Sequence, residues 1–132
     1  MISNPEYGWC EFDLGDFHGT PSYMTNVPVD LLECFINYFK YECSCCYFDE
    51  EGSDFTLVLT PYEVYIIENK EDEPKVRAID VMIIEMVKEL INDIESNIEE
   101  WACFHCGVLD TKVQVQYIKQ LRKLIYELEE FI

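Results

Sequence analysis

Seven cysteines and two histidines are the side chains of this sequence with the widest range of chemistry. Cys103 and Cys106 form a Cys-x-x-Cys pair with His105 between them, and three further cysteines lie far upstream, at Cys43, Cys45 and Cys46. Two cysteine pairs brought together by the fold would make a tetrahedral zinc site. The Cys103–Cys106 pair alone would suit thiol–disulfide exchange, although no thioredoxin-like βαβ pattern surrounds it. Free cysteine more often packs as a small apolar side chain, so we predict no cofactor and keep a metal or redox site at Cys103 and Cys106 as an alternative.

No other motif indicates catalysis. His18 and His105 are the only histidines, and neither has a nucleophile at a diagnostic spacing. The acidic stretch 49–54 lacks the alternating oxygen ligands and the distal glutamate of an EF-hand loop. There is no glycine-rich phosphate loop and no serine elbow. We therefore predict a protein that is not an enzyme, with an enzyme acting on a cationic small molecule as a remote alternative.

The charge balance is the most unusual property of the chain. There are 27 acidic and 9 basic side chains, so the formal net charge is -18. This is far beyond the magnitude of about 2–8 that suits the solubility of a small domain, and it opposes folding through self-repulsion. Direct binding of nucleic acid or of an anionic membrane needs basic patches. The charge therefore excludes these two classes of ligand and favours a basic protein partner.

The acidic excess lies in the body of the chain. Residues 110–132 hold four acids and four bases, so the whole negative charge belongs to residues 1–109. One cluster consists of Asp49, Glu50, Glu51 and Asp54, and a second consists of Glu68, Glu71, Asp72 and Glu73. A ladder of like charges at i+4 spacing, Glu85, Glu89 and Asp93, destabilises an isolated helix by a few tenths of a kcal/mol per pair. Acidic faces that are simply solvated are common, but two acidic clusters together with a ladder of like charges favour a functional role for the acids.

The elements that would position these clusters can be predicted from periodicity. A run of four strands is expected at 43–48, 55–60, 62–68 and 75–79, and a hairpin at 7–14 and 17–24. Helices are expected from Pro28 to about Tyr41, from a cap at Asp80 to about residue 103, and from Asp110 to the C-terminus. The predicted fold is α+β, an antiparallel sheet made of the hairpin and the meander, with three α-helices mainly on one face. Consecutive antiparallel strands would place both acidic turns at the same end of the sheet.

Length and cysteine number set the domain and the compartment. A chain of 132 residues is expected to form one domain, 1–132, with a core of its own. Residues 1–6 do not have the basic and apolar segments of a signal peptide. No apolar run approaches the roughly 20 residues of a membrane span. An odd number of cysteines without an export signal favours reduced thiols, so we predict a cytoplasmic protein.

In size, acidity, α+β pattern and lack of a catalytic site, the chain resembles the small acidic immunity proteins of bacterial toxin–immunity systems, including those of contact-dependent growth inhibition. The resemblance implies a protein that neutralises a nuclease toxin.

From the charge clusters we predict that the partner-binding residues are Asp49, Glu50, Glu51, Asp54, Glu71, Asp72 and Glu73. Aromatic anchors are needed as well, because rim charges contribute more to rate than to affinity; Tyr47, Tyr62 and Tyr65 are candidates. The same acidic surface would also suit an alternative function, that of a phage-encoded mimic of nucleic acid that blocks a host defence enzyme.

Overall fold

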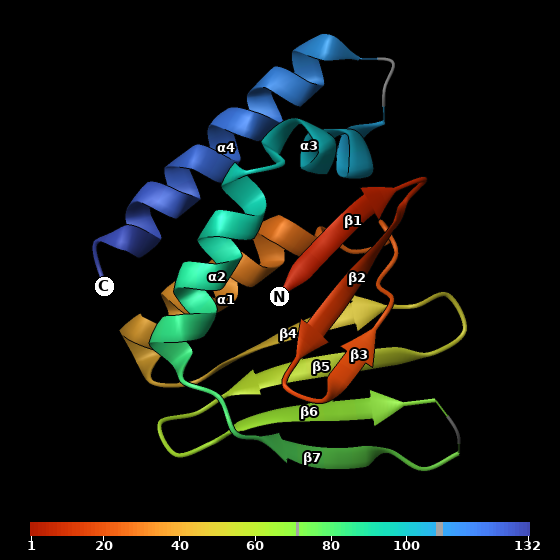
Figure 1. Cartoon of the computed structure of the whole chain (residues 1–132), viewed down its shortest axis with the longest axis vertical. Helices are drawn as coiled ribbons and strands as arrows, with labels where there is room; N and C mark the ends of the chain where they lie inside the picture. The colour runs from red at the N-terminus through yellow and green to blue at the C-terminus, as the bar shows by residue number, and fades with distance from the viewer. Residues whose placement is uncertain (71, 108–109) are drawn as a thin grey trace.

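The computed structural model describes residues 1–70, 72–107 and 110–132, and these form two antiparallel sheets and four helices (Figure 1). The predicted α+β class with antiparallel pairing is therefore confirmed. The strands are divided between a three-stranded and a four-stranded sheet. The helix number differs from the three predicted, because the second predicted helix is two helices.

The N-terminal sheet has the order β1-β2-β3, with β1 (Ile2–Glu6), β2 (Trp9–Leu14) and β3 (Phe17–Gly19). The predicted hairpin is present, since Leu14 pairs with Phe17 across the Gly15-Asp16 turn. Cys10, Phe12 and Leu14 are buried on one face of β2, as the alternation of its residues predicts. Strand β1, which was not predicted, adds an outer strand to this hairpin.

The second sheet is the predicted meander, in the order β4-β5-β6-β7. Its strands are β4 (Ser44–Asp49), β5 (Asp54–Leu59), β6 (Val64–Asn69) and β7 (Lys75–Ile79). One face packs against the N-terminal sheet through four phenylalanines, with neighbouring ring centroids 4.7 to 6.0 Å apart. These rings belong to Phe12, Phe17, Phe48 and Phe55. We call this side of the meander its inner face.

Helix α1 (Val27–Tyr41) begins and ends as predicted, with Pro28 in its first turn, where the missing N–H costs nothing. Its stripe of Leu32, Phe35 and Ile36 is buried, and the helix packs against β4 and against α4 (Thr111–Glu129). The Asp110 carboxylate caps α4 by accepting from the backbone N–H groups of Lys112 and Val113. No helix in the described part of the chain has the length and apolar character needed to cross a membrane.

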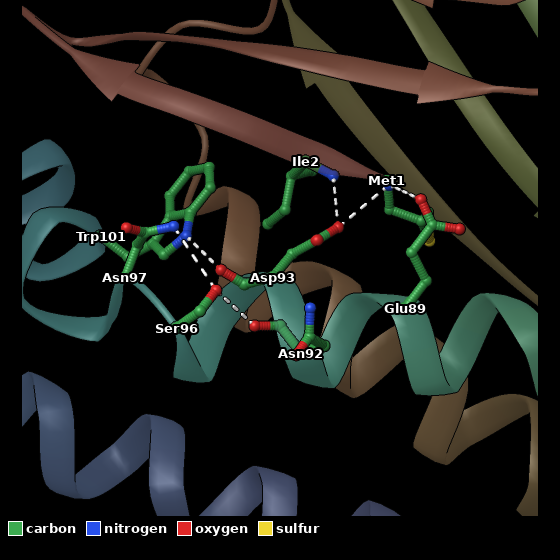
Figure 2. Close-up of polar contacts among 8 residues, drawn as sticks. All are labelled: Met1, Ile2, Glu89, Asn92, Asp93, Ser96, Asn97 and Trp101. Carbon is green, nitrogen blue, oxygen red and sulfur yellow. Dashed lines mark hydrogen bonds and ion pairs between the residues drawn. The ribbon is translucent and has the colours of Figure 1, made fainter.

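The predicted second helix is wrong in its length and its cap. Instead, α2 (Ile83–Glu95) and α3 (Ile98–Cys106) are separated at Ser96 and Asn97, and α2 is capped at Met82 rather than Asp80. The Ser96 hydroxyl donates to the Asn92 carbonyl at 2.7 Å, a local bond that competes with continued helix. The chain then turns so that the buried Trp101 donates its indole N–H to the Asp93 carbonyl at 3.1 Å (Figure 2).

Candidate functional site

The two acidic turns lie at the same end of the meander, as predicted. Asp49 pairs with Asp54 across the β4–β5 turn, and Asp54 pairs in turn with Asn69 at the start of the β6–β7 turn. The Asn69 side-chain amide donates to the Asp54 carboxylate at 2.8 Å and joins the two turns. Figure 1 shows both turns at the right-hand end of the four-stranded sheet. Glu71, one of the predicted binding residues, lies outside the described residues.

The β4–β5 turn contains four acids and no base. Within it the Glu50 carboxylate is committed to structure, because it accepts from the Thr20 N–H at 2.8 Å and from the Ser53 hydroxyl at 3.0 Å. It thereby fastens the turn to the segment that follows β3. The Glu51 backbone donates to the Asp49 carboxylate at 2.6 Å, which orders the turn internally. We call Asp49, Glu51 and Asp54 the acidic tip: the Asp49 and Asp54 carboxylates each accept one bond from within the two turns, and Glu51 is exposed.

The β6–β7 turn is less negative than its acids suggest. Glu68 lies on the inner face, with a side chain only 12% exposed, and pairs with Arg77 at 3.2 Å and with Lys70 at 4.0 Å. Lys75 also lies next to this group. Asp72 and Glu73 are exposed, so they are the described residues of this turn that remain available. The β4–β5 turn therefore dominates the negative potential at this end.

The acidic ladder on α2 has a structural role that the sequence did not indicate. Glu89 and Asp93 both contact the amino group of Met1, with the Asp93 oxygen at 3.0 Å, and Asp93 also accepts from the Ile2 N–H at 3.2 Å (Figure 2). Burial lowers the pKa of this amino group, but the hydrogen bonds with Glu89 and Asp93 outweigh burial and raise it above its ordinary value. Two of the three ladder carboxylates thus hold β1 against α2; Glu85 and Glu89 remain exposed to solvent, whereas Asp93 is largely covered.

The outer face of the meander is the feature that sequence reasoning missed. It consists of Cys45, Tyr47, Thr56, Val58, Tyr65, Ile67, Val76 and Ala78, which lie in two cross-strand rows. Tyr47 is 48% exposed and Val76 is 64% exposed, so no element of the described chain covers this part of the face. The bases of β7, Lys75 and Arg77, point to the other side by strand alternation. The sequence did contain one sign of this face: segments 55–59 and 64–67 carry apolar residues on both sides of the strand.

Tyr47 connects the outer face to the acidic tip. The pKa of its phenol is raised by partial removal from water, by the neighbouring charges of Asp54 and Asp49, and by a hydrogen bond to Asp54. The strand register places Tyr47 next to Asp49 and diagonally across from Asp54 on the same face of the sheet. Tyr65 lies in the other row of the same face, paired with Val58, and Tyr62 stands in the β5–β6 turn at the opposite end of the sheet.

The Cys103–Cys106 pair lies in the last turn of α3, where the helix dipole disfavours thiolates. Burial, followed by Cys103 and Asp110, raises the pKa of the Cys106 thiol, which makes it a poor nucleophile at neutral pH. All seven cysteines are free thiols, and within the described residues no group of three or more metal-binding side chains comes together. His105 stacks on Tyr117 with ring centroids 5.0 Å apart. Cys103 and Cys106 are both half-buried.

The acidic tip and the outer face offer carboxylates, phenols and apolar side chains, but no histidine and no basic group. Such a set can recognise a cationic surface. No family model, curated protein or solved structure matches this chain. Its function is therefore inferred from the chemistry of its own surface.

Proposed function

We propose that this protein is a non-enzymatic inhibitor of the immunity type, which binds a basic protein, a nuclease toxin above all, and blocks its active cleft. The observation that carries the proposal is the position of the acidic tip beside an uncovered sheet face of tyrosine, valine and isoleucine. Carboxylates of the tip would occupy the sites at which the cleft binds phosphates. The outer face would pack against the apolar surroundings of that cleft.

The two parts of this surface contribute different terms to binding. Long-range attraction between the acidic protein and a basic partner raises the association rate, to as much as 10⁸–10⁹ M⁻¹s⁻¹ at low salt. Affinity depends on buried anchors, and aromatic side chains are the commonest of these. Tyr47, next to Asp49 and Asp54, is placed to act as such an anchor. A strong dependence of the association rate on salt follows from this division.

The backbone of the acidic tip is ordered before binding. Glu50 is bonded to Thr20 and Ser53, and the Ser22 N–H donates to the Asp49 carbonyl at 2.8 Å. A turn fixed at three points loses little conformational entropy when a partner docks, which increases affinity without new contacts. Glu50, predicted to bind the partner, thus acts on binding by holding its neighbours.

The proposal is tested by affinity capture from the source organism at low salt, followed by elution in a salt gradient. We expect a basic nuclease to be retained, and its activity to fall as purified protein is added. The double variant Glu51→Lys/Asp54→Lys should bind that nuclease at least about tenfold more weakly, since close charge pairs contribute about 1.5 kcal/mol or more. The control is Glu99→Lys/Glu100→Lys, which makes the same charge change in the first turn of α3. Equal binding by both variants would contradict the interface, and capture of no basic protein would contradict the function.

A further inference from the structure

A second recognition feature lies at the end of the meander opposite the acidic tip. There the β5–β6 turn, the end of β7 and the segment that leads into α2 surround a groove of about 580 Å³. Tyr38 and Phe39 of α1 form part of its wall, and Phe39 is held in place by stacking on Phe131 with ring centroids 5.4 Å apart. The groove shares no residue with the acidic tip and shares only Ala78 with the outer face, so it is distinct from the tip.

The rim of the groove exposes an aromatic ring together with two carboxylates. Tyr62 is 93% exposed, and nothing in the described chain packs on its ring. Glu63 and Asp80 line the same groove, and neither pairs with a lysine or arginine among the described residues. No lining residue is basic. The groove therefore combines apolar walls with two unneutralised negative charges.

The turn that presents Tyr62 is locked by Thr60. The Thr60 hydroxyl donates to the Glu63 carbonyl at 2.6 Å and accepts from the Glu63 and Tyr62 N–H groups at 3.0 and 3.3 Å. Pro61 lies between them and fixes its own φ angle. The exposed ring and the Glu63 carboxylate thus start from a backbone that is already ordered, which lowers the entropic cost of binding.

We propose that this groove receives an arginine side chain of a protein partner. The guanidinium would stack on Tyr62 and pair with Glu63, as planar cations do with aromatic faces and carboxylates. Its aliphatic stem would lie on Met82, which is 69% exposed at the groove. The N-terminus of α2 adds a partial positive charge of about half a unit, which is smaller than the two carboxylate charges, so the groove still attracts a cation.

The test uses a blocked peptide, acetyl-Gly-Arg-Gly-amide, titrated into the labelled protein while backbone amide shifts are followed by NMR. At physiological ionic strength, exposed charges more than about 8 Å apart are largely screened, which suppresses diffuse association with the acidic surface. We expect saturable shifts confined to residues 60–64 and 78–84. The citrulline peptide, which has nearly the same shape and no charge, should give none.

Two variants identify the contacts. Tyr62→Ala should weaken the arginine peptide by about two- to fivefold, the range of an exposed cation–π contact, and Glu63→Gln should weaken it to a similar extent. Tyr7→Ala is the matched control, because Tyr7 is 92% exposed but lies in the β1–β2 turn. The proposal is overturned by equal binding of the citrulline peptide, by unchanged affinity in Tyr62→Ala, by strongest shifts at 49–54 or by the absence of a saturable shift.

The proposed function supplies the idea of a basic protein partner, but the peptide experiment does not need that partner. If the peptide fails to bind, the result of the charge-reversal experiment at the acidic tip is unaffected. If the charge reversal does not change the affinity for the nuclease while the peptide binds, the groove is an arginine site and the acidic tip is not the interface.

Discussion

Ile66 and Ile67 are neighbours on β6 that point to opposite faces of the meander, and replacing each with alanine tests the structural basis of the proposed interface. Ile66 is fully buried in the inner row, paired with Leu57 and Arg77. Ile67 lies on the outer face between Thr56 and Val76. The two substitutions remove the same atoms from the same strand, so the change in strand propensity is similar and the difference reports burial.

The expected costs follow from the surroundings. Ile66→Ala leaves a cavity in a packed core, and such changes cost about 2–5 kcal/mol. Ile67→Ala leaves no enclosed cavity, because the face is open to water. A fully buried CH₂ group contributes about 0.8 kcal/mol. The loss of three carbons from a partly exposed isoleucine should therefore lower the free energy of unfolding by about 1 kcal/mol. The free energy of unfolding should therefore fall by at least about 1 kcal/mol more in Ile66→Ala.

Urea unfolding measures both values, with tryptophan fluorescence, to which the buried Trp101 and the partly exposed Trp9 contribute, and far-ultraviolet circular dichroism as two probes of one transition. Equal losses in the two variants would refute the assignment of an uncovered outer face. With the captured nuclease in hand, Ile67→Ala should also weaken binding although its fold is nearly as stable as that of the parent protein. Full retention of affinity would remove the outer face from the interface and leave only the acidic tip.

Two other predictions concern the fold that supports this surface. Gly19 lies against Phe55, and a Cβ at this position would come within 2.5 Å of the buried ring. Gly19→Ala should therefore lower the free energy of unfolding by about 1–3 kcal/mol in the same urea assay. An unchanged urea midpoint would contradict the close contact. Burial raises the pKa of Cys10 to about 12 and that of Cys34 to about 11, against an ordinary value of 9.0. Because only the unfolded chain loses these protons just above pH 9, the free energy of unfolding should fall as pH rises from about 9 to 12, and Cys34→Ala should reduce that slope.

Much of the fold could be predicted because strong local signals agree with the tertiary structure. The meander has apolar, β-branched runs separated by turns rich in glycine, proline, asparagine and acids, and each predicted strand is present. Strand β1 carries no such signal: it contains Pro5, and Asn4 has a φ of 51° that breaks the register with β2. Pairing with β2 and the contacts of Met1 with α2 hold it instead. Periodicity reports only local sequence, so it does not predict these contacts between segments far apart in the chain.

The break between α2 and α3 was missed for a related reason. The apolar stripe of the segment continues through Ser96 and Asn97, so its periodicity predicts one helix. Local hydrogen bonding by Ser96 and the long-range placement of Trp101 decide the outcome. Likewise, the sequence shows where acids are concentrated, but only the structure separates carboxylates that hold the fold together from those left at the surface.

The acids of this chain fall into two groups, those that hold the fold together and those left at the surface. The most structural of the acids, Glu50 and Asp93, accept backbone hydrogen bonds that tie distant segments together, and folding alone accounts for them. Glu51 and Asp72 have no comparable role, and with their acidic neighbours they add repulsion to the folded state. The outer face beside them leaves apolar area in water at about 25 cal/mol per Å² of lost stabilisation. Under the proposed function, a cationic surface with apolar patches that covers this side would recover both losses together, because the same contact would neutralise the charges and remove the face from water.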